Sequence, residues 1–440
     1  MPTRMVTSSL KRKMLVLEFK LEGKTAQYEI LNEMIRTGRF IRNACVRYWI
    51  DNEKIGRYDL SAYCKTLADN PEFPWAKKLN SMARQAMAER AWSSISRFYE
   101  NCKKKVLGNK GYPKFQRHQT RASVEYKTSG WKLSEDRRYI SFNDGFKAGS
   151  FKIWGSRDLH YYQLDQIKRV RVVRCADGYY VQFCIDQERN ESHEFCDRMV
   201  GIDLGLNYFY SDSDGNQIEN PRFLRKGEKA LRRAQRKVSR KFRKLSHEAE
   251  KAKQSNNYKK ARNKLGRKHL KVQRRRNDFA CKTARAQVLS SDLVAIEDLK
   301  VCNMVKNHHL AKSIADASWS RFREWLEYFG RVFGVPIVAV APHFTSQDCS
   351  NCGKKVQKAL SVRTHSCPHC GYIQDRDINA ALNILKKALM SLSKTKTTVG
   401  HTESNVLEIS DCKTSVGETS TGSLSQESSE SDFRSPPSQS

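Results

Sequence analysis

Residues 349–385 read CSNCGKKVQKALSVRTHSCPHCGYIQDRDINAALNIL and contain two Cys-x-x-Cys pairs. A glycine directly follows each pair and allows the tight turn of a metal-binding knuckle. Four thiolates in a tetrahedral array suit a closed structural zinc site, which leaves no open position for catalysis. The alternative is a set of four unconnected core or redox thiols. The expected zinc ligands are Cys349, Cys352, Cys367 and Cys370.

Three carboxylates stand at the ends of apolar segments. Asp203 ends the apolar run VGID, Glu297 ends the run LVAIE, and Asp377 opens the helical pattern DINAALNIL. A carboxylate at the end of a buried strand is costly unless it is paired or binds a cation. If the three converge at one sheet edge, they could hold two Mg²⁺ ions that clamp the attacking and leaving oxygens of a phosphodiester. Taken singly, each acid could be only a helix cap or a surface group.

Two close carboxylates, Asp375 and Asp377, compete for the role of third acid. Asp377 starts a helix predicted to run to Leu389, with small or apolar residues on one face. We expect that face to pack on the sheet that carries the other two acids, which would bring the first turn close to the strand ends. Asp375 precedes the helix, where it could pair with Arg376 or water. The sequence therefore favours Asp377. The apolar face consists of Ala380, Ala381, Ile384 and Leu385.

The order of elements around these acids is that of an RNase H-like fold. From residue 199 the pattern predicts a strand, a hairpin, helices, a strand, a helix over 313–333, a strand and a last helix. Upstream, a strand-like run over 14–21 precedes a helical block, and strands with Asp-Gly turns follow over 123–185. A helical block inserted into a small β-barrel fits this upstream pattern.

The charge of the chain predicts a polyanionic partner. Lys and Arg number 81 and Asp and Glu 47, for a net charge of +34 in 440 residues. Nucleic acid is the first candidate partner and an anionic membrane surface the second. The longest apolar run, 332–341, contains Gly334 and Pro336 and falls short of the roughly 20 residues that a membrane span needs.

Much of the positive charge lies in the helical stretch 222–285, which holds 26 basic and 4 acidic residues, a net +22. A solvated helical face usually carries compensating acids four residues away, and this stretch lacks them. We therefore expect it to contact a nucleic-acid backbone. The candidate contacts are Arg232, Arg233, Arg236 and Lys237.

The remaining features bear on location and on the end of the chain. The 13 cysteines do not suggest a secreted disulfide framework, and the N-terminal residues do not read as a signal peptide. We expect a reducing, cytoplasmic location in a prokaryote. Residues 391–440 are rich in Ser and Thr, which predicts a disordered tail.

Several motifs together resemble the TnpB family, transposon-encoded proteins related to the type V CRISPR effectors. The resemblance covers about residues 10–390 and is strongest where the cysteine pairs lead into DRDINAA. The matching motifs are GYPKFQ, YKTSGWKL, QIKRVRVVRCADGYYVQF, VGIDLGLN, AIEDL, LAKSIADASW, APHFTSQDCSNCG and CPHCGYIQDRDINAALNIL.

The resemblance implies a multidomain α+β protein with a RuvC-like nuclease domain. It matches Asp203, Glu297 and Asp377 to the catalytic acids and the four cysteines to the zinc ligands, and it places Gln85 where the family reads a short DNA motif. The implied domains are a wedge-like β-barrel (1–25 and 106–197), a helical recognition insert (26–105), the nuclease (198–344 and 372–390) with its basic insertion (222–285), a zinc ribbon (345–371) and the tail (391–440).

The expected function is that of an RNA-guided, Mg²⁺-dependent DNA endonuclease of an insertion sequence. The partners would be a guide RNA and double-stranded target DNA, with neither a membrane nor a small-molecule substrate. One alternative is a transposase that joins DNA ends with the same acidic triad, since hydrolysis and strand transfer share two-metal chemistry. The other is a non-catalytic nucleic-acid-binding regulator.

Overall fold

The computed structural model describes residues 4–5, 14–106, 108–117, 122–242, 254–359 and 362–398. The expected disordered tail falls mostly outside these residues. Of the described helices, none is both long enough and apolar enough to cross a membrane.

A seven-stranded antiparallel sheet occupies the first half of the chain. Its strands pair in the order β3-β7-β8-β2-β6-β5-β4. One of the Asp-Gly turns predicted over 123–185, Asp177-Gly178, joins β7 to β8 in a hairpin. Among the described strands no ladder joins the edge strands β3 and β4, so the expected closed barrel is not confirmed. The strands are β2 (Leu15–Glu22), β3 (Ala122–Tyr126), β4 (Trp131–Leu133), β5 (Tyr139–Phe142), β6 (Ser150–Trp154), β7 (Ile167–Cys175) and β8 (Gly178–Ile185).

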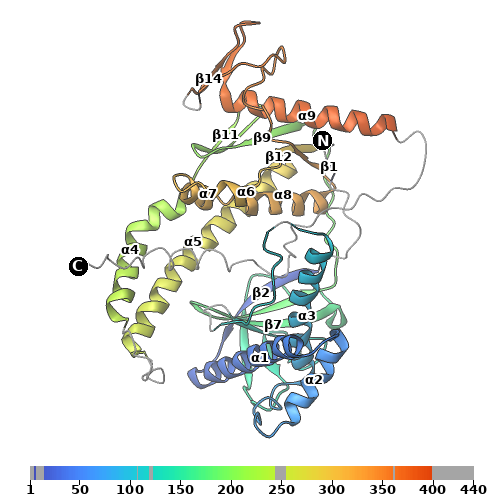
Figure 1. The fold of residues 1–440 in the computed structure, drawn as a ribbon, viewed down its shortest axis with the longest axis vertical. Helices are drawn as coiled ribbons and strands as arrows, with labels where there is room; N and C mark the ends of the chain where they lie inside the picture. Colours follow the sequence, from blue (N-terminus) through green and yellow to red (C-terminus); the bar gives the residue numbers. More distant parts are fainter. Residues whose placement is uncertain are drawn as a thin grey trace.

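Three helices lie between β2 and β3 in sequence, as the helical periodicity predicted. They are α1 (Thr25–Asp51), α2 (Arg57–Asp69) and α3 (Ser81–Lys103). Their apolar stripes share one core with the seven-stranded sheet, because Leu31, Met34 and Ile95 are buried together with sheet residues such as Phe183. Figure 1 shows these helices against that sheet in the lower part of the molecule.

A second, six-stranded sheet carries Asp203 next to the last residue of one strand and Glu297 at the end of another. Its order is β1-β13-β12-β9-β10-β11, with β9, β12 and β13 parallel. All five residues of β12 are buried, as expected of a parallel strand covered on both faces. The strands are β1 (Arg4–Met5), β9 (Met199–Leu204), β10 (Tyr208–Asp212), β11 (Gln217–Glu219), β12 (Leu293–Glu297) and β13 (Ile337–Val340).

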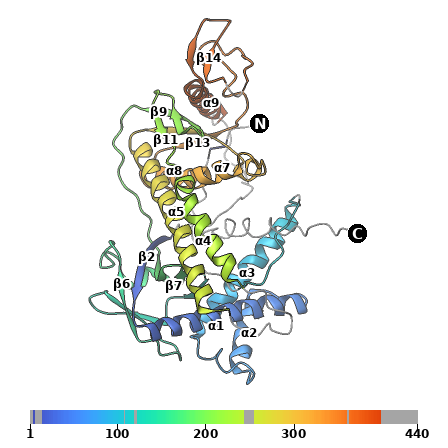
Figure 2. The ribbon, with the colours of Figure 1, turned by 90° about the vertical axis from the view of Figure 1, so that its left-hand side faces the viewer.

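Helices cover both faces of the six-stranded sheet. One face packs on α9 (Arg376–Thr398), and the other on α5 (Asn256–Leu289) and α8 (Trp319–Phe333). The basic stretch forms α4 (Phe223–Lys241) and α5, which run side by side from this sheet to the seven-stranded one (Figure 2).

Two helix boundaries differ from the sequence expectation. The helix predicted over 313–333 is divided into α7 (Ala311–Ala317) and α8, because Ser318 adopts a left-handed conformation with φ 57°. The last helix continues to Thr398 rather than ending at Leu389. The expectation that the disordered tail begins at residue 391 was therefore wrong. Short elements complete the described chain: η1 (Leu164–Gln166), α6 (Val301–Met304), β14 (Thr364–Ser366) and β15 (Ile373–Asp375).

Candidate functional site

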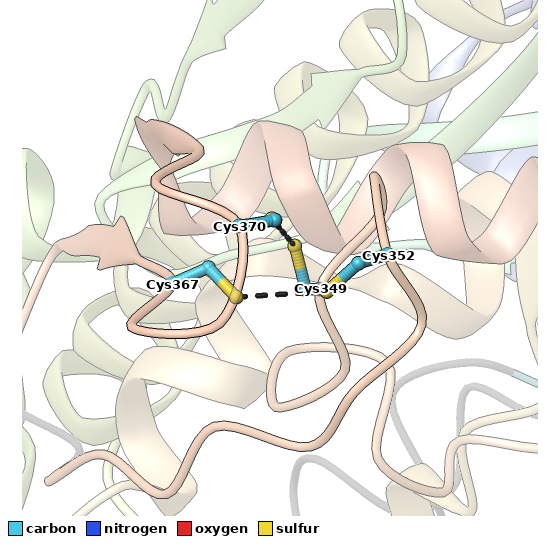
Figure 3. A group of neighbouring side chains, drawn as sticks. All are labelled: Cys349, Cys352, Cys367 and Cys370. Atoms are coloured by element: carbon cyan, nitrogen blue, oxygen red, sulfur yellow. Dashed lines mark hydrogen bonds between the residues drawn. The ribbon is translucent and has the colours of Figure 1, made fainter.

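The four cysteines predicted to bind zinc lie together beside the β14–β15 hairpin (Figure 3). Their sulfur atoms all lie within 4.8 Å of one another, with Cys349 Sγ 3.7 Å from Cys370 Sγ and Cys352 Sγ 3.6 Å from Cys367 Sγ. Tetrahedral zinc with Zn–S bonds of about 2.3 Å sets its sulfur ligands about 3.8 Å apart. The cluster therefore has the dimensions of a Cys₄ zinc site.

The two glycines after the cysteine pairs make the turns of this cluster. Gly353 and Gly371 have φ of 75° and 70°, and their amides donate to the carbonyls of Cys349 and Cys367 at 2.8 and 2.9 Å. A side chain at either position would be strained in this conformation.

Cys352→Ser should lower the zinc content by one ion per chain and lower the melting temperature. A structural zinc contributes its binding free energy to folding, and a hydroxyl replaces a thiolate poorly. Cys302→Ser is a control, because Cys302 is exposed on α6 away from the cluster. Metal analysis showing unchanged zinc in Cys352→Ser would contradict the assignment.

The fold brings the three candidate acids to one region of the six-stranded sheet. Asp203 and Glu297 lie at the carboxyl ends of the parallel neighbours β9 and β12, and Asp377 lies in the first turn of α9. Burial raises the pKa of Asp203 well above its usual range, and the charges of Glu297 and Asp377 raise it further. The oxygens of the three carboxylates are not all within 4.8 Å of one another, as those of a tightly closed site would be.

Close packing of α9 on β9 sets the position of Asp377. Gly201 in β9 has no side chain, and a Cβ there would lie 2.1 Å from the carbonyl oxygen of Ala381. Ala380 and Ala381 are fully buried at this contact. The sequence prediction that small residues let the helix approach the sheet is correct for Ala380 and Ala381, and it missed Gly201 on the strand side.

The capping role at the start of α9 belongs to Asp375 rather than to Asp377. Asp375 Oδ1 accepts from the backbone amides of Asp377 at 2.8 Å and Ile378 at 3.3 Å. The carboxylate of Asp377 makes ion pairs with Arg376 at 3.0 Å and Arg363 at 3.5 Å. The carboxylate of Asp377 is thus held by two arginine side chains and not by the backbone amides of the helix.

A polar connection that the sequence did not predict holds the side chain of Glu297 in place. Burial raises the pKa of Glu297, which is 7% exposed, and a hydrogen bond from the hydroxyl of Thr345 opposes this rise. The carbonyl of Thr345 accepts from Asn383 Nδ2 of α9 at 2.9 Å. The chain after β13 is therefore tied both to an acid on β12 and to the helix that carries Asp377.

Asn379 continues this connection toward the zinc cluster. Its amide accepts from Ser350 N at 2.9 Å and donates to the carbonyl of Asp348 at 2.9 Å. Asn379 and Asn383 are both buried. The signal in the sequence was two asparagines four residues apart on the face of α9 that we read as purely apolar.

Thr345→Val should reduce metal-dependent cleavage about tenfold, since a hydrogen bond to a charged group contributes about 1.5–3 kcal/mol. The variant keeps the shape of the side chain and removes the hydroxyl. Thr345→Ser should restore activity and the Mg²⁺ concentration needed for half-maximal cleavage. If serine and valine behave alike, the hydroxyl has no role in positioning Glu297.

The basic residues singled out on α4 form an exposed face. The helix buries Leu231, Ala234 and Val238 and leaves its charges outward. One of them, Arg232, pairs with Glu228 in the same helix. The exposed residues are Arg232, Arg233, Arg236 and Lys237.

Other basic side chains of the same stretch form ion pairs within the protein. Arg276 pairs with the buried Asp316 at 2.8 Å, and Arg274 pairs with Asp177 at 2.6 Å in the β7–β8 turn. The Arg274 pair joins α5 to the seven-stranded sheet. Part of the positive charge of this stretch is therefore neutralised by acids of the protein itself.

Gln85 lies apart from the acids and the cysteine cluster. It is half-buried on α3, and its side-chain carbonyl accepts from Lys127 Nζ at 3.3 Å. Lys127 also pairs with Glu89 at 2.8 Å.

Comparison with known proteins agrees with this arrangement. A family described as "Probable transposase" matches residues 182–308, and one described as "Cas12f1-like, TNB domain" matches residues 319–384. InsQ of Escherichia coli K12, whose name describes it as a candidate RNA-guided DNA endonuclease, is 26% identical over 368 residues, 79% of this chain and 85% of InsQ. The chain resembles proteins of the TnpB family.

Other similarities cover less of the chain or are more distant. A protein of Streptomyces pristinaespiralis, also named as a candidate RNA-guided DNA endonuclease, is 38% identical over 192 residues, 43% of this chain and 45% of that protein. The cryo-EM structure of a Cas12f1–sgRNA–target DNA complex is 15% identical and covers 82% of this chain and 83% of that chain, with a TM-score of 0.48.

Proposed function

We propose that this chain is an RNA-guided, Mg²⁺-dependent DNA endonuclease of an insertion sequence. It would hydrolyse phosphodiester bonds of double-stranded DNA next to a short motif. The observation that carries the proposal is the edge of the six-stranded sheet, where Asp203, Glu297 and the first turn of α9 come together in a chain that resembles the TnpB family. The names of its relatives support the same activity.

The acids at this edge fit a divalent cation. Burial and neighbouring carboxylates raise the pKa of Asp203, and gathered carboxylates are unfavourable until a cation balances them. Asp203 and Asp377 would flank the metals, and Glu297 would hold the second and orient the attacking water. When bound, Mg²⁺ supplies the positive charge that stabilises the phosphodiester transition state.

The proposed roles are assigned separately to the two sheets. We assign the six-stranded sheet with α9 to a RuvC-like nuclease domain and the cysteine cluster to a zinc ribbon. The seven-stranded sheet would form the wedge, with α1–α3 as the recognition block and Gln85 contributing to reading the adjacent motif. Base pairing with the guide would read the target sequence, while the protein reads the short motif and the backbone shape. The protein would act on DNA in the prokaryotic cytoplasm.

Neutralising Arg232, Arg233, Arg236 and Lys237 together should weaken RNA binding and flatten its dependence on salt. Each lost phosphate contact removes about one unit of slope in log affinity against log salt. Replacing the three arginines by lysine is the matched control, since it keeps the charge and should keep the slope. An unchanged slope in the neutralised variant would mean that this face of α4 points away from the nucleic acid.

Sequencing the RNA that co-purifies with the protein, followed by cleavage assays on a plasmid that carries the matching target, tests the proposal. Cleavage should require both the RNA and Mg²⁺. A transposase would instead act on transposon ends without a guide, and a regulator would bind without any metal-dependent nicking. Either result would replace the proposed function.

A further inference from the structure

A second group of metal-ligating side chains lies at the amino ends of β9 and β12, at the opposite end of these strands from Asp203 and Glu297. It consists of His193, Cys196 and Asp292, with one ligand atom from each all within 4.8 Å of one another. Among the described residues, only this group and the four cysteines meet that condition. The side chains of His193 and Asp292 are 12% and 14% exposed, whereas Cys196 is exposed.

The contacts orient one oxygen of Asp292 toward the other two ligands. Asp292 Oδ1 lies 2.8 Å from His193 Nε2 and 3.6 Å from Cys196 Sγ. The backbone amide of Arg198 donates to Oδ2 at 3.2 Å, and that of Cys196 is shared by both oxygens at 3.2 Å. Such outer hydrogen bonds to a carboxylate are typical of metal sites, where they fix the ligand in place.

We propose that His193, Cys196 and Asp292 bind a second zinc ion through three protein ligands. A thiolate, an imidazole and a carboxylate together suit Zn²⁺, and the exposure of Cys196 leaves the fourth position open to water. Ligand atoms around tetrahedral zinc lie about 3.3–3.8 Å apart. The 3.6 Å distance between Cys196 Sγ and Asp292 Oδ1 already fits this range. The 2.8 Å distance between His193 Nε2 and Asp292 Oδ1 is too short, so the imidazole would have to move outward by roughly half an ångström.

Binding replaces a hydrogen bond and releases a proton. The thiol of Cys196 gives up its proton to solvent as the sulfur bonds to the metal, and the imidazole of His193 presents the lone pair of Nε2 with its proton on Nδ1. The hydrogen bond between His193 and Asp292 is exchanged for two bonds to the same ion. Affinity for zinc should therefore rise with pH.

The position of the site gives it a structural purpose. Residues 186–198 connect β8 of one sheet to β9 of the other, and the amide of Asp292 donates to the carbonyl of Arg198 at 2.7 Å. The ion would fasten this connection to the start of β12, at the base of the two strands that carry Asp203 and Glu297. Zinc binding at this site is independent of the proposed nuclease activity.

Zinc stoichiometry of the full-length chain tests the proposal. After equilibration with Zn²⁺ and removal of the excess, the wild type should hold two ions per chain and Cys196→Ser one. Cys302→Ser, a control at another exposed thiol, should hold two. Cys196→Ser keeps the hydrogen bond between His193 and Asp292, so loss of zinc there cannot be ascribed to a lost contact between those two residues.

Alkylation of Cys196 gives a second reading that does not depend on a variant. Zn²⁺ should slow the reaction of this exposed thiol with iodoacetamide, a chelator should restore the rate, and Cys302 should react at the same rate throughout. A single zinc per wild-type chain, together with alkylation of Cys196 that Zn²⁺ does not change, would show that the three residues form only a hydrogen-bonded cluster.

Discussion

Replacing Asp377 with alanine should reduce Mg²⁺-dependent DNA cleavage by on the order of a thousandfold or more while RNA binding stays near that of the wild type. A carboxylate that ligates a catalytic metal contributes several kcal/mol to the transition state, and each 1.36 kcal/mol changes the rate about tenfold. We proposed RNA binding for the exposed basic residues of α4, and Asp377 lies on α9, away from that helix. Single-turnover cleavage and RNA affinity, measured on the same preparation, separate the two effects.

Asp375 is the matched control for this substitution, because it lies two residues away and caps the same helix. Asp375→Ser keeps a side-chain oxygen for the amides of Asp377 and Ile378 and should retain substantial cleavage. Asp375→Ala removes the cap and should cost about 1 kcal/mol of helix stability without abolishing the chemistry. If Asp375→Ser is inactive and Asp377→Ala is active, the third acid is Asp375.

The strands of the candidate site could be predicted from the sequence because their burial leaves a plain pattern. Near-continuous apolar runs that end in an acid mark β9 and β12, and the Asp214-Gly215 turn marks the β10–β11 hairpin. The paired cysteines marked their own cluster by spacing alone. In each case the signal is local, so a few neighbouring residues suffice to specify the structure.

The features that the sequence did not reveal depend on partners far away in the chain. The break between α7 and α8 comes from the left-handed backbone conformation of Ser318, and none of the neighbouring residue types predicts that conformation. Asn383 is informative only once Thr345 lies beside it, and in the sequence nothing distinguishes Arg276, which pairs with Asp316, from a surface charge. Charge composition likewise cannot distinguish the Lys and Arg side chains that pair with acids of the protein itself from those that remain available to nucleic acid.

Among the residues whose role the sequence did not reveal, Gly201 is the one whose substitution should have the largest effect on stability. Gly201→Ala should destabilise the six-stranded part by about 3 kcal/mol or more, since overpacking a tight interior typically costs 1–3 kcal/mol and here the obstacle is backbone. The added Cβ would lie 2.1 Å from the carbonyl oxygen of Ala381 and 2.8 Å from the amide of Leu385. The helix α9 must then move away from β9, which also shifts Asp377 relative to Asp203, and cleavage should fall with stability.

Gly227→Ala supplies the control, because Gly227 lies within α4 and a Cβ there meets only a methyl group of Val272 at an ordinary 3.5 Å. It should be neutral or stabilise the protein by up to about 1 kcal/mol, as alanine favours helix more than glycine does. Urea denaturation of both variants makes the comparison. Shortening a side chain with Leu385→Ala should not rescue Gly201→Ala, since the clash is with main-chain atoms of α9. A Gly201→Ala protein as stable and active as the wild type would mean that α9 does not pack on β9 this closely.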